Sequence, residues 1–200
     1  MLVARTSAGL EEVDDRVRAR GGRATLVPLD LRDGKGIDRL GGVLAERYGR
    51  LDVLIGNAAE LGVLSPLGHV DPKVFERVMA LNAGANHRLI RSLDPLLRAA
   101  EAGRAIFVTC APAREAKPFW GAYGASKAAL EALVLSYAAE TRRSRLRVNL
   151  IDPGPLRTRL RAKAYPGEAP DKVPLPETRT DAFVALAAPD CARHGELITG

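Results

Sequence analysis

Short apolar runs alternate with longer segments of helical periodicity along the chain, and this alternation restricts the possible fold more than any other feature. Six such runs predict strands at Leu2–Ala4, Ala24–Pro28, Asp52–Gly56, Ala105–Thr109, Arg147–Ile151 and Glu196–Ile198. Strands separated in this way by helices are typical of a parallel sheet that carries helices on its faces. We therefore expect an α/β fold.

The helical segments support the same fold. Helical periodicity covers Leu10–Arg20, Gly36–Tyr48, Pro72–Ala100 and Ala122–Arg142. Asp71 followed by Pro72 is a typical start signal, because the carboxylate can cap the helix and Pro suits its first turn. With 200 residues, of which 46% are hydrophobic, the chain fits one domain with a sizeable core.

The composition excludes several classes of protein. The net charge is +6, and only six of the 30 basic residues are lysines. Arginines could bind nucleic acid, but they stand beside acidic residues, aromatic content is 4% and no nucleic-acid-binding pattern occurs, so we expect no such partner. No apolar run approaches the roughly 18 to 20 residues that cross a bilayer, and no secretory leader is recognisable, so we expect a cytoplasmic protein without a membrane partner. Cys110 and Cys191 lack metal-ligand spacing, and we expect them to be reduced thiols without a metal.

Tyr123 and Lys127 are the strongest candidates for catalysis. They are four residues apart on a predicted helix and therefore share one face. A nearby ammonium stabilises phenolate and lowers the pKa of a tyrosine from about 10. Such a phenol can protonate a carbonyl oxygen or deprotonate an alcohol. The spacing alone is weak evidence, since a solvated helix surface can carry the same pair.

Further motifs place this pair in a known family. The segments Asp52–Ala59, Leu81–Gly84 and Asn149–Gly154, together with Leu29-Asp30-Leu31, occur in the right order around the Tyr123 helix. In these motifs the chain resembles the short-chain dehydrogenase/reductase family over nearly its whole length. The resemblance implies a Rossmann-like, doubly wound parallel sheet, a bound nicotinamide dinucleotide, and hydride transfer between that cofactor and a small-molecule alcohol or carbonyl substrate.

The resemblance also assigns catalytic roles. Tyr123 matches the general acid/base, and Lys127 matches the lysine that lowers its pKa and holds the nicotinamide ribose. Asn82 matches an asparagine that supports a proton-relay water, although an Asn in a helix can simply satisfy nearby backbone groups. Cys110 stands thirteen residues before Tyr123, where the family has a serine that binds the substrate oxygen. A thiol is a weaker donor than a hydroxyl, and the adjacent Thr109 could substitute only if the strand ends before it.

Candidate cofactor-binding residues follow the predicted strands. Asn57 and Ala58 match a motif that lines the cofactor, and Asp30 matches a carboxylate near the adenine. Pro153, Gly154 and Thr158 match the residues around the carboxamide end of the nicotinamide, beside Tyr123 and Lys127. Arg5 stands where an acidic residue would select NAD, and its charge suits a 2′-phosphate. We therefore expect NADP to be preferred, with NAD possible.

The family's first strand and glycine-rich turn are missing from the sequence. The chain starts at what resembles the second strand, so the fold is expected to be incomplete at the N-terminus, with a gap between Leu2–Ala4 and Asp52–Gly56. A missing strand leaves two inner edges without partners or forces them to re-pair. One explanation is a product that extends roughly 35 to 40 residues upstream of Met1, enough for one βα unit; another is a truncated gene product.

Two alternatives to catalysis stay open at this point. The missing turn and Cys110 favour a non-catalytic protein that uses the same fold to bind a partner, and the arginine surface leaves a weaker case for nucleic-acid binding. Residues 165–180, rich in Pro and charge, predict a long loop, which either lies beside the substrate or is an irregular surface connection. The resemblance further implies a homodimer or homotetramer formed through the Pro72–Ala100 and Ala122–Arg142 helices.

Overall fold

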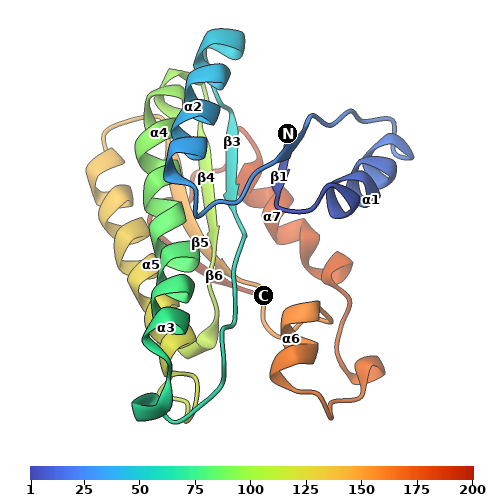
Figure 1. Cartoon of the computed structure of the whole chain (residues 1–200). Coiled ribbons are helices and arrows are strands. Elements are labelled where there is room, and N and C mark those ends of the chain that lie inside the picture. The colour runs from blue at the N-terminus through green and yellow to red at the C-terminus, as the bar shows by residue number, and fades with distance from the viewer.

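The computed structural model describes all 200 residues and shows a parallel α/β fold in two parts (Figure 1). The strands are β1 (Leu2–Ala4), β2 (Leu26–Pro28), β3 (Val53–Gly56), β4 (Arg104–Val108), β5 (Arg147–Asp152) and β6 (Leu197–Thr199). The α-helices are α1 (Ser7–Arg18), α2 (Gly34–Tyr48), α3 (Pro72–Met79), α4 (Ala85–Ala99), α5 (Gly121–Thr141), α6 (Arg159–Ala164) and α7 (Thr180–Ala187). All six predicted strands are therefore confirmed, with ends that differ by two residues or fewer.

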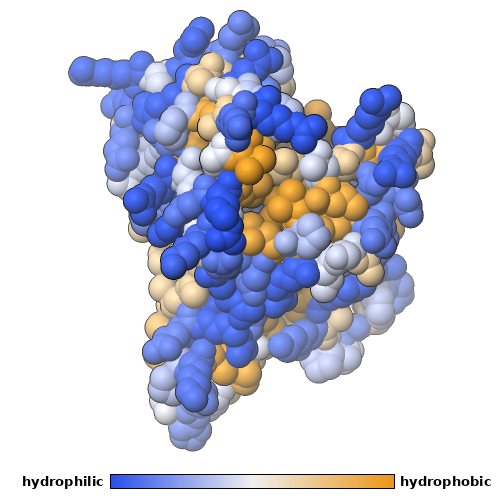
Figure 2. Space-filling model, turned by 45° about the horizontal axis from the view of Figure 1, so that its top comes forward, coloured by the Kyte–Doolittle hydropathy of each residue, from blue (hydrophilic) through white to orange (hydrophobic).

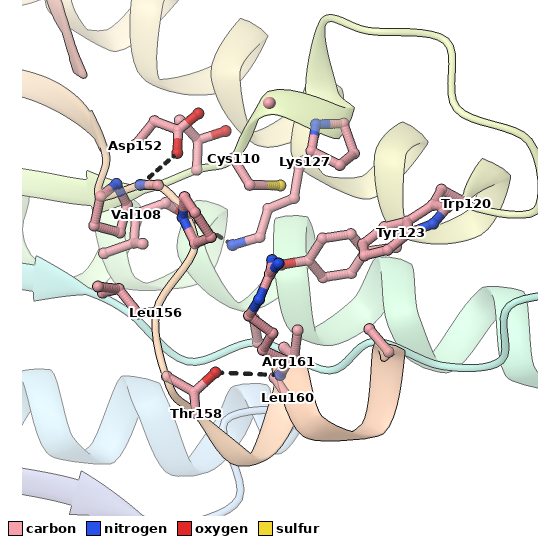
Figure 3. A pocket seen from close by; sticks show the side chains of 18 of the residues that line it. Val108, Cys110, Trp120, Tyr123, Lys127, Asp152, Leu156, Thr158, Leu160 and Arg161 are labelled. Carbon is pink, nitrogen blue, oxygen red and sulfur yellow. Dashed lines mark hydrogen bonds between the residues drawn. The ribbon is translucent and has the colours of Figure 1, made fainter. Parts of the chain in front are cut away.

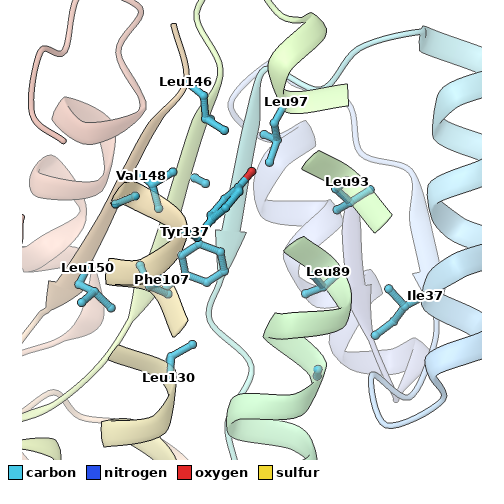
Figure 4. Packing of buried hydrophobic residues seen from close by; sticks show 14 of the residues in the cluster. Ile37, Leu89, Leu93, Leu97, Phe107, Leu130, Tyr137, Leu146, Val148 and Leu150 are labelled. Atoms are coloured by element: carbon cyan, nitrogen blue, oxygen red, sulfur yellow. The ribbon is translucent and has the colours of Figure 1, made fainter. Parts of the chain in front are cut away.

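The larger part is a four-stranded sheet in the order β3-β4-β5-β6, with every pair parallel. Helices α2, α4 and α5 cover one of its faces, and α7 packs on the other (Figure 1). The main core lies between the sheet and the first group of helices, where Phe107, Leu130 and Leu97 are completely buried (Figure 4). A smaller cluster of Ile106, Ile151 and Leu186 lies under α7. This doubly wound arrangement is the predicted one.

The smaller part consists of β1, α1 and β2. Strands β1 and β2 pair in parallel, with Leu2 opposite Leu26, and form a sheet of their own. No hydrogen bond joins β1 to β3, so the predicted gap in the sheet is present and the inner edges have not re-paired. Ile55 in β3 is consequently 46% exposed. Figure 2 shows apolar surface gathered in a hollow between the two parts.

The predicted helix Pro72–Ala100 is interrupted by a wider turn. Asp71 caps α3 as expected, since its carboxylate accepts a hydrogen bond of 2.7 Å from the Lys73 amide. Residues Ala80–Gly84 then form a π-helical turn before α4 begins. Such turns inside helices occur frequently at functional sites. Asn82 lies in this turn and is completely buried.

The segment after β5 is more regular than the sequence predicts. Two short 3₁₀ turns, Pro170–Lys172 and Pro176–Arg179, lie within the predicted loop of residues 165–180, and the helices α6 and α7 flank it. Arg161 in α6 binds the Glu168 carboxylate through two hydrogen bonds of 2.6 Å, which fold the start of the segment back on α6. No helix of the structure has the length and apolar character that crossing a membrane requires.

Candidate active site

A cavity of about 720 Å³ lies where β3, β4 and β5 end and α5 begins (Figure 3). The residues that follow the three strands line one side of it, and the first turns of α5 and α6 line the rest. In open parallel sheets, ligands bind outside the carboxyl ends of the strands. The cavity is therefore the first candidate for a binding site.

Tyr123 and Lys127 both line this cavity, as their spacing predicts. Their relative exposures are 6% and 2%, and the Lys127 Nζ lies 6.0 Å from the centre of the Tyr123 ring. The Lys127 Nζ donates a hydrogen bond of 2.8 Å to the Val108 carbonyl at the end of β4. Gly124 lets α5 approach the preceding turn, because a Cβ there would lie 2.6 Å from the Pro112 carbonyl oxygen. Local sequence thus brings the two functional groups to one wall.

The pKa of Tyr123 does not follow the sequence-based expectation. Burial raises the pKa of the Tyr123 phenol above its usual value, with smaller contributions in the same direction from Cys110 and Asp152. The expected lowering by Lys127 is therefore wrong for this structure, because burial disfavours the charged phenolate. Burial also lowers the pKa of Lys127 to about 8. At neutral pH the site thus holds a neutral phenol and a predominantly charged ammonium.

Cys110 lines the cavity two residues after the end of β4 (Figure 3). Burial raises the pKa of its thiol, so the sulfur is a neutral and weak donor. The adjacent Thr109 also lines the cavity, but its hydroxyl is already bonded within the protein. Its hydroxyl donates a 2.5 Å hydrogen bond to the Glu131 carboxylate, although the strand does end before it, at Val108.

Five of the predicted cofactor-binding residues also reach the cavity: Asn57, Ala58, Pro153, Gly154 and Thr158. Gly154 has a φ of 73°, a conformation that other residues rarely adopt, and its amide binds the Asp152 carboxylate at 3.1 Å. Thr158 caps α6 by accepting a hydrogen bond of 3.2 Å from the Arg161 amide. Pro153, Gly154 and Thr158 form the cavity wall that follows the end of β5, whereas Asn57 and Ala58 line the cavity from the end of β3.

Asn82 does not line the cavity. Its amide oxygen accepts a 2.8 Å hydrogen bond from the Glu60 amide, and its Nδ2 donates bonds of 2.9 Å to the Glu60 carbonyl and to the Ser126 hydroxyl. Both of its N–H donors are thereby used. The side chain ties the loop after β3 to α5, one residue before Lys127. This arrangement matches the alternative in which the Asn satisfies nearby backbone, and it does not test the proton-relay role.

Arg5 and Asp30 lie outside the cavity, on the β1–β2 part. Both follow the carboxyl ends of their strands, and the Leu29 amide binds the Ala4 carbonyl at 2.9 Å, which brings the two strand ends together. Arg5 is exposed and belongs to no ion pair. Asp30 instead binds Arg32 through its carboxylate, and this hydrogen bond lowers the pKa of Asp30 to about 2. The two residues are close to each other but are not brought together with Tyr123.

Sequence reasoning missed the outer wall of the cavity. The Lys117 ammonium lies 4.7 Å from the centre of the Trp120 ring and 4.9 Å from that of Tyr165. Trp120 also packs edge-on against Tyr123, at 5.8 Å between ring centres. Trp120, the only Trp of the chain, stands three residues before Tyr123, and that spacing is a signal that could have identified it.

A network of charges behind the cavity was missed as well. Arg114, in the turn after β4, binds the carboxylates of Glu131 in α5 and Asp152 at the end of β5. Its contact with Asp152 is 2.7 Å long. No local pattern predicts this contact, because the three residues come from three separate elements.

Comparison with known proteins identifies relatives along almost the whole chain. The family model described as short chain dehydrogenase matches residues 1–169. The uncharacterized oxidoreductase YciK of Escherichia coli K12 is 33% identical over 196 residues, which are 96% of this chain and 77% of that protein. A fatty acyl-CoA reductase of Mycobacterium tuberculosis is 40% identical over 136 residues, 66% of this chain but only 46% of that protein. A crystal structure of a short chain dehydrogenase from E. coli CFT073 complexed with NADPH superposes with a TM-score of 0.93 at 33% identity, covering 99% of this chain and 84% of that one.

Proposed function

The chain belongs to the short-chain dehydrogenase family, and we propose that it transfers a hydride between NADP(H) and a small alcohol or carbonyl compound. The observation that carries this proposal is the buried pair of Tyr123 and Lys127 in one cavity at the carboxyl ends of the strands. When bound, the nicotinamide supplies the hydride.

In this proposal Tyr123 exchanges the proton. The phenol is protonated at neutral pH and is therefore in the form that can donate to a carbonyl oxygen. Lys127 carries a positive charge at the same wall and uses only one of its three N–H donors, toward Val108. The other two can hold hydroxyl groups of a bound ligand and stabilise the phenolate that forms on Tyr123. Asn82 would position this wall through Ser126.

The residues on the nicotinamide side fit a dinucleotide. Asn57, Ala58, Pro153 and Gly154 present backbone and small side chains to the cavity. Arg5 supplies a free cation at the end of β1, and the related E. coli protein was crystallised with NADPH. The residues fit the pyrophosphate of the dinucleotide less well. A pyrophosphate-binding turn has closely spaced glycines directly after a strand. No such glycines follow a strand here, since they occur at Gly21-Gly22, Gly34 with Gly36, and Gly41-Gly42.

A titration with NADPH tests the proposal. We expect the nicotinamide fluorescence to change with saturation as NADPH is added to the purified protein. Absence of binding at millimolar NADPH would contradict the proposal and favour the partner-binding alternative, which the open inner edges of β1 and β3 support.

Arg5 should determine the preference between the two dinucleotides. We expect Arg5→Ala to weaken NADPH binding about tenfold to a hundredfold, the loss typical of one charge-assisted phosphate contact, and to leave NADH binding unchanged. Arg23→Ala is the matched control, because Arg23 is equally exposed but precedes β2 at the opposite end of the sheet. An equal loss for both dinucleotides would exclude a contact with the 2′-phosphate.

Cys110→Ser should raise turnover. A hydroxyl at this position is a better hydrogen-bond donor to the substrate oxygen than the neutral thiol, and donors to such oxygens contribute up to about 10²–10³ in rate. Since the thiol supplies part of this effect, we expect an increase on the order of tenfold in kcat with little change in NADPH affinity. Cys191→Ser serves as the control, because Cys191 does not line the cavity. An unchanged kcat in Cys110→Ser would exclude Cys110 from the substrate-oxygen site.

The substrate would enter beside the outer wall. Trp120, Tyr165, Leu156 and Leu160 give this side of the cavity an apolar and aromatic surface. We propose that the segment from Tyr165 onward, within the 165–180 loop, contacts the part of the substrate remote from the reacting carbon.

We further propose that the chain forms a homodimer or homotetramer through α3, α4 and α5. A second, shallow groove on these helices is lined by small and apolar residues, among them Met79, Ala83, Ala129 and Leu133. Small side chains allow helices of two copies to pack closely.

A further inference from the structure

Arg114 is the cation that pairs with two carboxylates beside the catalytic wall, whose other hydrogen bonds come from the neutral Thr109 hydroxyl and the Gly154 amide. Its guanidinium binds Glu131 and Asp152 at the same time, and the side chains of these two acids are 13% and 9% exposed. Partly buried carboxylates without a cation are costly, since little water solvates them. Arg114 is therefore the main electrostatic partner of both carboxylates.

Lys127 is the other cation that these acids could pair with. Glu131 follows it by one helical turn on α5, and Asp152 lines the same cavity from the end of β5. Cys110 and Tyr123, which also face Lys127, are neutral at pH 7. The other titratable residues that line the cavity are Glu115 and Lys117 in the loop before α5, and Arg161 and Tyr165 in and after α6. Nevertheless Lys127 takes part in no ion pair, and its ammonium donates a single hydrogen bond, to the Val108 carbonyl.

We propose that Arg114 is a positioning residue of the active site, which binds Glu131 and Asp152 and thereby leaves the Lys127 ammonium free for a ligand. The burial of Lys127 lowers its pKa to about 8, and Cys110, Glu131 and Asp152 oppose this shift. Because Arg114 neutralises Glu131 and Asp152, these two carboxylates raise the pKa of Lys127 only slightly. The effect of Arg114 on the charge around Lys127 is inferred from these contacts alone. Only its consequence for catalysis rests on the proposed function.

The pKa of Lys127 can be measured directly in the protein without NADPH. The chain has only six lysines, so ¹³C labelling at Cε gives six resonances in NMR spectra, and Lys127→Met identifies the one of interest. We expect Arg114→Met to raise the pKa of Lys127 by about one unit, because it removes a positive charge and frees two negative ones. Arg114→Lys should restore most of the original value.

Arg88→Met is the matched control. The Arg88 side chain is also 32% exposed and binds a carboxylate, that of Asp38, on the far side of α4 from the cavity. The Arg88→Met variant should leave the pKa of Lys127 unchanged. Should Arg114→Met fail to fold, Glu131→Gln provides the opposite test, since the loss of one negative charge should lower the pKa of Lys127.

An unchanged Lys127 pKa in Arg114→Met, or in Glu131→Gln where that variant replaces it, would overturn the proposal. A second measurement connects the result to the reaction. If the proposed function holds, turnover should decline as the pH rises through the Lys127 pKa, and Arg114→Met should move this decline to higher pH by the shift that NMR reports. Absence of turnover in the wild type would reject the proposed function and leave the NMR result unaffected.

Discussion

Replacing Tyr123 by Phe should reduce turnover by about 10²- to 10⁴-fold, the usual contribution of a general acid. The substitution removes one hydroxyl and keeps the ring, so the edge-on contact with Trp120 at 5.8 Å between ring centres is retained. We therefore expect NADPH binding to change by less than about threefold. Steady-state rates with any carbonyl compound that the wild type reduces, together with fluorescence titration of NADPH, measure the two quantities.

Tyr48→Phe controls for the loss of a phenol elsewhere. Tyr48 is 49% exposed at the end of α2 and does not line the cavity. Its variant should be as active as the wild type. A Tyr123→Phe enzyme that retains more than a tenth of the wild-type kcat would show that another group supplies the proton.

The parallel sheet could be predicted from sequence because each strand carries its own local signal. In β4 the neighbouring residues Ile106 and Phe107 are buried on opposite faces of the sheet, as a continuous apolar run suggests. The gap beside β3 could be predicted too, since it depends only on which units of the family pattern the sequence contains. The structure confirms it with two sheets that do not pair.

Elements stabilised by distant contacts could not be predicted. The π-helical turn interrupts an otherwise continuous helical pattern, and its Asn82 contacts Glu60 and Ser126, which are 22 and 44 residues away. Helix α6 has six residues and no apolar period long enough to detect. Its fold depends on the Thr158 cap and on the pairing of Arg161 with Glu168.

The same distinction applies to the site. Tyr123 and Lys127 could be found because helical geometry places them on one face and the motifs around them distinguish the pair from a solvated helix surface. The predicted direction of the Tyr123 pKa shift was wrong, because the spacing of residues reveals a nearby charge but not how deeply the phenol is buried. Burial is the largest cause of the shift in this structure. Lys117 and Arg114 were missed for a related reason, since their contacts join separate loops and strands.

Asn82→Ala should lower the free energy of unfolding by about 2 to 4 kcal/mol. The substitution removes one buried and two partly buried hydrogen bonds and leaves the Glu60 amide and carbonyl without their partner. For a protein of this size such a loss lowers Tm by roughly 5 to 15 °C. Urea and thermal unfolding followed by circular dichroism measure the change, provided that unfolding is two-state.

Asn86→Ala separates this effect from the general cost of a buried amide. Asn86 is 3% exposed, lies four residues further along, and donates a single bond of 2.9 Å to the Asn82 carbonyl, so its loss should cost only about 1 kcal/mol. The two variants also distinguish two roles for Asn82. If Asn82→Ala unfolds like the wild type but loses turnover, the side chain acts on the reaction itself. If stability falls as expected and turnover falls with it, the amide acts by holding the loop after β3 against the helix that carries Tyr123 and Lys127.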